Sequence, residues 1–152
     1  MSGQSFSSSQ RGFSLIELLI VVAIIGIIAA ITIPYLAQAK QSANGASAIS
    51  SLRIIHSAEA SYKASNGRYG DRAALSNAKY LNDPGLVAGA KSKYNFDVTA
   101  GDPVLGDATL YYSATATPAS EPARWQHYFI DVTGIMRTNL GAPATTSSAP
   151  LN

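Results

Sequence analysis

Glu17 is the residue of this 152-residue sequence whose chemistry most needs an explanation. It stands at the head of an apolar run, and the next charged residue is Lys40. An ionised carboxylate inside a bilayer costs roughly 2.5 to 3.5 kcal/mol, so it requires either water or a cationic partner. At a membrane interface the side chain can extend to water or complement the positive end of a helix. The other interpretation is that the cation comes from a second copy of the chain.

The dipeptide Gly12-Phe13, just before Glu17, indicates where such a cation could arise. Cutting the chain between these two residues would remove a polar segment and expose a positive α-amino group on Phe13. In two helices packed side by side with an axial stagger, the amine of one copy can reach the carboxylate of the other. Such a pair is far stronger in a dry bundle than in water, so it would fix the register between copies.

The other chemistry-bearing side chains form no catalytic pattern. His56 and Glu59 lie three residues apart in a predicted helix, a spacing that can hold a metal, but no further ligands can be assembled around them. His127 lies among aromatic residues, where a packed imidazole is expected. No P-loop, G-x-S-x-G, G-x-G-x-x-G or H-E-x-x-H motif occurs, and cysteine is absent. We predict that the chain is not an enzyme and uses no cofactor and no metal.

The composition narrows the class of protein further. Lys plus Arg number 11 and Asp plus Glu number 9, so the net charge is only +2, and no nucleic-acid partner is predicted. The length fits one domain, or one small domain with an anchor. Hydrophobic residues make up 47% and charged residues 13%, against about 25% charged in ordinary globular proteins. The excess of apolar residues is concentrated near the N-terminus.

The apolar run is long enough to cross a membrane. From Leu18 to Ala39 there are 22 uncharged residues, and about 20 suffice for a helix across a bilayer core of about 30 Å. We therefore expect a polar leader over residues 1–12 and a hydrophobic transmembrane or filament-core helix over residues 13–35. Pro34 lacks an amide donor, so it predicts a kink or a local break at the preceding turn.

After Pro34 the pattern becomes periodic, which predicts an amphipathic helix half over residues 36–65. Asn66-Gly67 then supplies a left-handed stop. A single helix from Phe13 to Ser65 would be about 80 Å long at about 1.5 Å per residue. The apolar positions that recur every three or four residues are Leu36, Ala39, Ala43, Ala46, Ile49, Leu52, Ile55, Ala58 and Tyr62.

The remaining sequence predicts a β-rich head over residues 66–140 and a flexible tail over residues 141–152. Turn residues are dense up to Val104, with a short helix across Arg72–Tyr80. Short connections favour antiparallel pairing of the strands. The predicted fold class is α+β, with the long N-terminal helix packed on a small antiparallel sheet that needs apolar surface from the helix. The expected strands are Tyr94–Thr99, Leu110–Thr117, Trp125–Asp131 and Ile135–Thr138.

The segment from Arg11 to Ile31, RGFSLIELLIVVAIIGIIAAI, closely resembles the N-terminal signature of type IV pilins and of the pseudopilins of type II secretion. The resemblance implies that a prepilin peptidase and methyltransferase cleaves after Gly12 and N-methylates Phe13. It implies that Glu17 drives assembly into a homo-oligomeric filament by inner-membrane assembly machinery. The precursor would be a single-pass protein of the inner membrane, and the product an extracellular pilus or a periplasm-spanning pseudopilus.

In assembled filaments of this family, the helix between a glycine and a proline can lose its regular hydrogen bonds. In this chain the resemblance places that helix break between Gly26 and Pro34. We expect regular helix there in the membrane-bound subunit and local melting in the filament. A filament map with continuous helix through these residues would contradict this expectation.

The rest of the chain resembles the family more loosely. Residues 62–70, YKASNGRYG, are similar to the helix exit of many pilins and major pseudopilins. The cysteine pair that staples the C-terminal loop of many pilins is missing, which favours a major pseudopilin as the alternative to a pilus subunit. Some major pseudopilins bind calcium in that region, but the available acids match no EF-hand spacing, and turn-forming aspartates are the other interpretation. These acids are Asp97, Asp102, Asp107 and Asp131.

Two other interpretations of the apolar run are weaker. A secretory signal peptide fits the A-x-A pattern at residues 37–39, but the helical periodicity continues straight through that cut. A plain single-span anchor explains the hydrophobicity, yet it predicts neither the leader ending in Gly12 nor the position of Glu17. A pilus subunit is therefore the function that we predict from the sequence.

Overall fold

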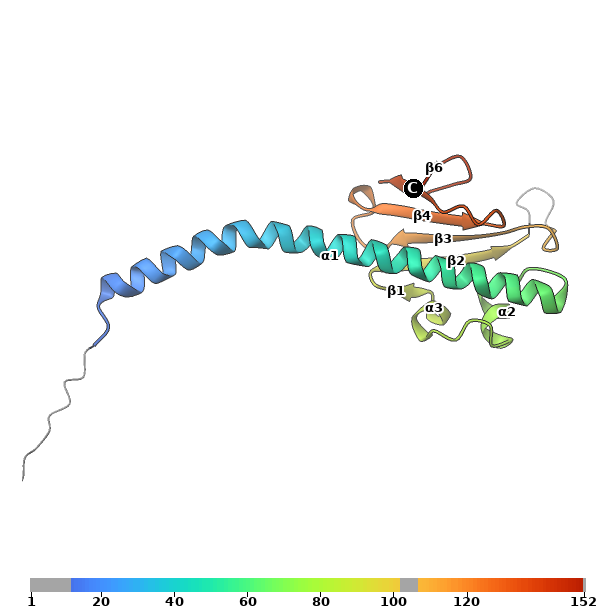
Figure 1. The fold of residues 1–152 in the computed structure, drawn as a ribbon, viewed down its shortest axis with the longest axis horizontal. Coiled ribbons are helices and arrows are strands. Elements are labelled where there is room, and N and C mark those ends of the chain that lie inside the picture. Colours follow the sequence, from blue (N-terminus) through green and yellow to red (C-terminus); the bar gives the residue numbers. More distant parts are fainter. Residues whose placement is uncertain (1–11, 102–106, 152) are drawn as a thin grey trace, which may run out of the picture. The chain divides into compact units, whose positions relative to one another are not determined.

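A computed structural model describes residues 12–101 and 107–151 of the chain. It divides into two compact units, one up to Ala39 and one from Lys40 onward, and each is described by itself. The α+β class predicted from the sequence is confirmed, with one long N-terminal helix and an antiparallel sheet (Figure 1). The helical elements are α1 (Leu15–Asn66), α2 (Arg72–Asn77), α3 (Pro84–Ala88) and the 3-10 turn η1 (Pro122–Arg124).

Helix α1 is 52 residues long and contains Pro34 without an interruption. Proline withholds only one amide, the one that would bond to the carbonyl of Ala30, and the flanking turns keep their helical form. Two residues before the proline, the hydroxyl of Thr32 donates to the carbonyl of Ile28 at 2.7 Å. The local break that Pro34 predicts is therefore absent from the single chain. The melting of Gly26–Pro34 was expected for the filament, and it stays a prediction.

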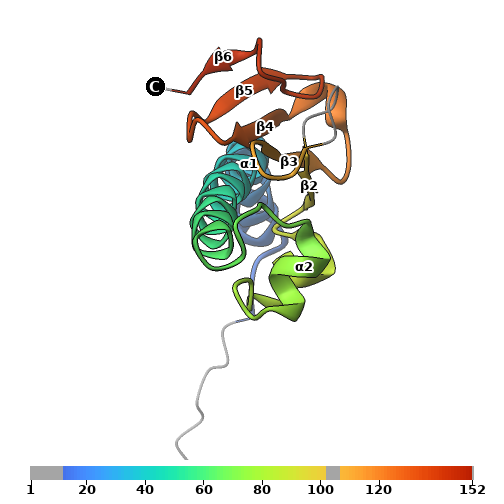
Figure 2. The same ribbon diagram turned by 90° about the vertical axis from the view of Figure 1, so that its right-hand side faces the viewer.

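The sheet is a simple antiparallel meander in the order β1-β2-β3-β4-β5-β6, which Figure 2 shows along the chain from β2 to β6. Phe96 pairs with Ala116, Ala114 with Ile130, and Tyr128 with Thr138. All four expected strands are present, with ends shifted by up to two residues. The strands are β1 (Ala90–Lys91), β2 (Tyr94–Ala100), β3 (Tyr112–Pro118), β4 (Gln126–Asp131), β5 (Arg137–Leu140) and β6 (Ala149–Pro150).

The core lies between the second half of α1 and one face of this sheet. The alternation of β3 is regular, with Tyr112, Ala114 and Ala116 buried and the intervening Ser and Thr half-exposed. The small alanines leave room for the helix, and larger side chains from both layers fill the space around them. The central members of this core cluster are Leu52, Ile55, Tyr62, Leu75, Leu86, Tyr94, Phe96, Val98, Tyr112, Tyr128 and Ile130.

The buried stripe of α1 differs in part from the one predicted. Leu36, Ala39, Ala43 and Ala46 are exposed, and the stripe begins at Gly45. The reason is close packing at Gly45, where an added Cβ would lie 2.6 Å from the Tyr128 hydroxyl oxygen. From there the prediction holds for the larger apolar residues. The buried residues of α1 are Gly45, Ala48, Ser51, Leu52, Ile55, Ala58, Glu59 and Tyr62.

The C-terminal segment has more order than its composition suggests. Ala149 pairs with Thr138 in the sheet, the amide of Leu151 donates to the carbonyl of Met136 at 2.8 Å, and Ala144 is buried. Backbone hydrogen bonds hold this segment, so few apolar side chains are needed. Pro150 is compatible with a strand here because an edge strand leaves half of its amides unpaired. The flexible tail expected over residues 141–152 thus contains an edge strand.

Candidate functional site

The predicted processing site lies just outside the first helix. Gly12 and Phe13 precede α1 in irregular backbone, and both are exposed, Phe13 by 86%. A Cβ placed on Gly12 would meet no atom within 4 Å. Exposed, non-helical backbone is what a protease can engage. Residues 1–11 of the expected leader lie outside the described residues, so the structure adds nothing about them.

Glu17 occupies the first turn of α1. The helix begins where the carbonyl of Ser14 accepts the amides of Glu17 and Leu18, at 3.1 and 3.2 Å. Ser14 and Glu17 have the S-x-x-E spacing of a capping box, in which the acid bonds back to the start of its own helix. Glu17 is exposed, and the ion pairs found within residues 12–101 and 107–151, Lys91–Asp83 and Arg124–Glu121, do not involve it. Its carboxylate is open to a partner outside the chain.

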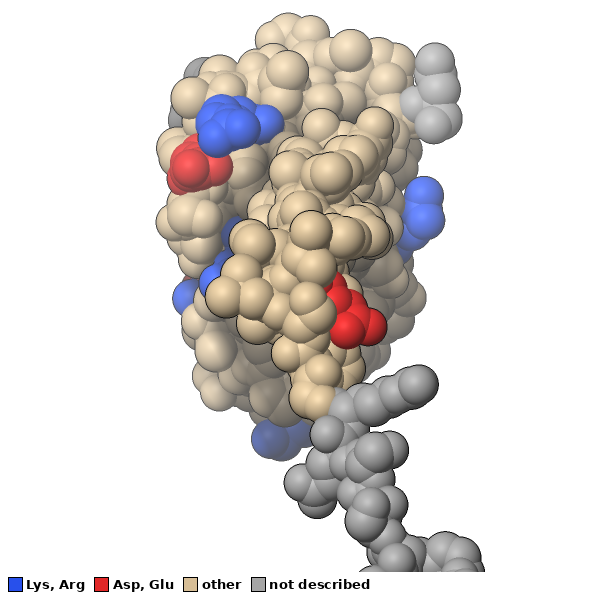
Figure 3. Space-filling view, turned by 90° about the vertical axis from the view of Figure 1, so that its left-hand side faces the viewer, with Lys and Arg blue, Asp and Glu red and all other residues tan. Residues whose placement is uncertain are grey.

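The first half of α1 presents an apolar surface on every side. Between Phe13 and Leu36 the large hydrophobic side chains are all exposed, from 46% at Val21 to 86% at Phe13. Figure 3, viewed from the N-terminal end of α1, shows the near part of this helix mostly in tan, the colour of residues other than Lys, Arg, Asp and Glu. By length and composition α1 can cross a membrane. In water such a surface would be unstable, so it requires lipid or other protein around it.

The two residues of the predicted helix break, Gly26 and Pro34, both lie in exposed, continuous helix. An added Cβ at Gly26 would meet nothing within 4 Å, so no contact within the chain requires a glycine there. Pro34 lies in continuous helix. Any packing need for Gly26 must therefore come from molecules around this helix half.

The two histidines, His56 and His127, make hydrogen bonds within the unit from Lys40 onward. The Nδ1 atom of His56 shares a hydrogen bond with the hydroxyl of Tyr112, and the Nε2 atom of buried His127 donates to the carbonyl of Pro122 at 3.1 Å. Glu59, three residues from His56, bonds instead to the amide of Gly70. Over the described ranges, no three His, Cys, Asp or Glu side chains lie close enough together to hold a metal. His56 and Glu59 thus both lie on α1, as the sequence predicted, but each bonds to a different partner.

Two of the aspartates considered for calcium, Asp107 and Asp131, each make a local turn. Asp107 accepts the amide and hydroxyl of Thr109, at 2.8 and 2.6 Å, and these bonds, the hydroxyl foremost, lower the pKa of Asp107. Asp131 bonds to Thr133 in the same way, and Asp97 accepts the hydroxyl of Thr99 at 3.4 Å. Such Asx turns explain an aspartate without a metal. Asp102 lies outside the described residues.

Sequence reasoning missed the environment of Glu59. It considered Glu59 only as a partner of His56, whereas the structure buries it completely. The spacing already contained the signal, because Ile55, Glu59 and Tyr62 follow one another at helical intervals of four and three residues. An acid on an apolar stripe predicts a buried, hydrogen-bonded carboxyl.

Comparisons with known proteins bear on the N-terminal site. Residues 7–33 match the family described as the prokaryotic N-terminal methylation motif. The chain is 35% identical to the type IV major pilin protein PilA of Myxococcus xanthus over 95 residues, which are 62% of this chain and 40% of that protein. It is 40% identical to a fimbrial protein of Dichelobacter nodosus over 103 residues, 63% of this chain and 62% of that protein.

A second group of relatives has a different named role. The chain is 38% identical to the type II secretion system core protein G of Pectobacterium carotovorum over 60 residues, 40% of this chain and 38% of that protein. The chain thus spans about two fifths of the length of this relative and of the PilA relative. The methylation motif and both groups of relatives agree with the resemblance found in the sequence.

Proposed function

We propose that this chain, whose relatives are type IV pilins and type II secretion pseudopilins, is the structural subunit of a type IV pilus. It is made as a single-pass precursor in the inner membrane. A prepilin peptidase and methyltransferase cleaves it after Gly12 and N-methylates Phe13. Assembly machinery then moves it into a filament whose interior is the first half of α1. We assign no enzymatic role to the chain.

The observation that carries this proposal is the helix half that bears the methylation motif, in which all the large hydrophobic side chains are exposed. Burying one side chain of the size of leucine or isoleucine contributes roughly 1.5 to 3 kcal/mol. The residues between Phe13 and Leu36 can gain this stabilisation in lipid before assembly and against neighbouring copies afterwards. One surface therefore supports both locations, inner membrane and filament.

Glu17 supplies the register in this account. After cleavage, the amine of Phe13 in one subunit pairs with the carboxylate of Glu17 in its neighbour. An unpaired charge in the filament interior is costly, so only the staggered arrangement that pairs both groups is stable. The exposed position of Glu17 in the first turn of α1 supports this role.

Replacing Glu17 tests the pairing, because two variants separate charge from helix capping. Glu17→Ala removes both, whereas Glu17→Gln keeps the capping-box spacing and removes only the charge. We expect both variants to insert in the membrane and to be processed, and both to enter filaments poorly. Normal filaments from either variant, counted by electron microscopy of sheared fractions, would refute the pairing.

A major pseudopilin of a type II secretion system is the alternative. The similarity to core protein G favours it, and so does the absence of the cysteine pair found in many pilins. Deleting the gene separates the two roles. A pilus subunit predicts loss of surface filaments with protein secretion intact, whereas a pseudopilin predicts loss of secretion with any surface filaments unchanged.

A further inference from the structure

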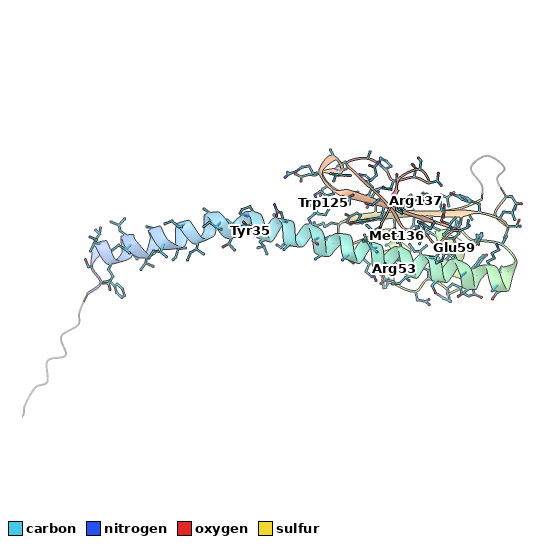
Figure 4. All side chains as sticks on the ribbon, turned by 45° about the horizontal axis from the view of Figure 1, so that its top comes forward. Tyr35, Arg53, Glu59, Trp125, Met136 and Arg137 are labelled. Carbon is cyan, nitrogen blue, oxygen red and sulfur yellow. The ribbon has the colours of Figure 1, made fainter. Side chains whose placement is uncertain are left out.

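Glu59 is a buried acid to which the proposed function assigns no role. Its side chain is 0% exposed, and it lies on the second half of α1, in the unit from Lys40 onward (Figure 4). Its Oε2 atom accepts a hydrogen bond from the amide of Gly70 at 3.0 Å. Its Oε1 atom is buried with no hydrogen-bond partner in the described part of the chain. An ionised carboxylate is costly in such a place, because burial leaves this oxygen without a hydrogen-bond donor among the described residues.

The hydrogen bond to Gly70 ties the segment that follows α1 back to the helix. Residues 67–71, here called the exit segment, turn back along the helix after Gly67, whose φ of +72° is left-handed. The amide of Tyr69 donates to the carbonyl of Ala108 at 2.8 Å, so this segment also ties down the loop before β3. Gly70 is tightly packed, since an added Cβ would lie 3.1 Å from the Tyr62 ring. Glu59 therefore anchors the middle of a tightly packed exit segment.

The groups around Glu59 favour its neutral form. Burial raises the pKa of Glu59 to about 7, the Gly70 amide partly offsets this, and the nearby charge of Asp71 adds to the rise. From the sheet, Tyr112 faces the acid, and burial followed by the charge of Glu59 raises the pKa of that phenol.

Charged and titratable groups on α1 and on the exit segment are turned to other partners or to solvent. On α1, His56 bonds to Tyr112, and the ammonium of Lys63 donates to the hydroxyl of Tyr69 at 3.3 Å. On the exit segment, exposed Arg68 lines a pocket of about 190 Å³ together with Gly70 and Asp71. This pocket is large enough for several water molecules. Water can therefore lie next to the exit segment without unfolding of the core.

We propose that Glu59 is a protonation-controlled latch on the exit segment. The neutral acid holds residues 67–71 closed against α1, and ionisation of Glu59 releases them toward the adjacent pocket. An ionised carboxylate gains water when the segment opens, whereas the neutral acid gains little. The head thus senses pH near neutrality at the point where its helix ends.

The sign of the effect follows from linkage. The folded head binds the Glu59 proton more tightly than the unfolded chain, so its contribution is full below the unfolded pKa of 4.5 and is lost as the pH rises through about 7. Between pH 5 and pH 8 the folding equilibrium constant is expected to fall by about 70-fold through this group. The local signature is a loss of protection at Gly70.

Hydrogen exchange on the full-length chain in detergent micelles tests the latch. Protection of the Gly70 amide, corrected for the intrinsic exchange rate at each pH, should fall between pH 6 and pH 8. In Glu59→Gln, which keeps the bond to Gly70 without a charge, the protection of Gly70 should stay constant. Glu121→Gln is the matched control, because Glu121 is an exposed acid and its loss should leave the wild-type pH dependence unchanged.

Either of two results would overturn the proposal. One is protection of Gly70 that is the same at pH 6 and pH 8 in the wild type, and the other is a fall of equal size in Glu59→Gln. If Glu59→Gln does not fold, the carboxyl carbon of Glu59 can be titrated by NMR in the wild type. A midpoint near pH 7 supports the latch, and a midpoint below pH 5.5 refutes it.

Discussion

Gly45 is the contact at which the structure can be tested most sharply. It is the first buried residue of α1, and an added Cβ would lie 2.6 Å from the Tyr128 hydroxyl oxygen and 3.6 Å from its Cζ atom. The first distance is a clash, and the second is an ordinary contact. Gly45→Ala should therefore be harmful only while the hydroxyl is present. The Tyr128 ring cannot easily withdraw, since it is 7% exposed and lies 5.8 Å from the ring of Tyr94.

The expected magnitudes follow from two opposing effects. Alanine in place of glycine stabilises a helix by about 1 kcal/mol. Overpacking a filled core costs about 1 to 3 kcal/mol. Gly45→Ala should then destabilise the wild type by up to about 2 kcal/mol, and stabilise the Tyr128→Phe variant by about 1 kcal/mol. The double-mutant cycle should give a coupling of about 1 to 3 kcal/mol between the two positions.

Urea unfolding of the full chain in detergent can measure this coupling. Trp125 is the single tryptophan and lies 6.1 Å from the ring of Tyr94, so its fluorescence reports on the head. Ala46→Gly is the control, because it makes the reverse exchange at the exposed neighbouring position and should cost about 1 kcal/mol in both backgrounds. An equal effect of Gly45→Ala with and without the Tyr128 hydroxyl would refute the proposed docking of α1 on the sheet.

Two further variants test the processing site and the exit segment. Gly12→Leu should block processing, because the proposed cut lies beside this residue, and mass spectrometry should find only the uncut precursor; Ser14→Ala, which leaves Gly12 and Phe13 in place, should be cut normally. Gly70→Ala should destabilise the head by about 1 to 2 kcal/mol, since its Cβ would lie 3.1 Å from Tyr62 and 3.2 Å from Ala74, and tryptic cleavage at exposed Arg68 should become faster. Unchanged cleavage at Arg68 would mean that the exit segment absorbs the methyl group.

Strands β2 and β3 were predictable because their burial alternates. Tyr94, Phe96 and Val98 are buried and the residues between them are exposed, which is the period of two that the sequence displays. Strands β1 and β6 were missed because two residues carry no period, and only their backbone pairing defines them. Backbone pairing of two residues cannot be predicted from the types of their side chains.

The docking face of α1 was only partly predictable. Leu52, Ile55 and Tyr62 are large, so burial is their strong preference, and they lie on the predicted face. Alanine is acceptable on either face of a helix, so Ala43 and Ala46 could not be told from Ala48 without the position of Tyr128. The environment of Glu59 likewise depends on the exit segment, which folds back by a route that helical spacing alone does not encode.

For the N-terminal site, the sequence predicts more than the structure of a single chain can add. Gly12, Phe13 and Glu17 were predicted as site residues from sequence alone, and the structure of one chain adds that they are exposed. Their proposed chemistry depends on a peptidase, a membrane and a second copy of the chain. Pairing between copies lies outside any single-chain structure, and so does melting between Gly26 and Pro34.

The intact mass and N-terminal residue of the protein from native membranes test the central claim most directly. The account predicts a chain that begins at N-methylated Phe13, with the leader of residues 1–12 removed. A chain that begins just after Ala39 would contradict it, because the apolar half of α1 and Glu17 would then be discarded before any filament could form.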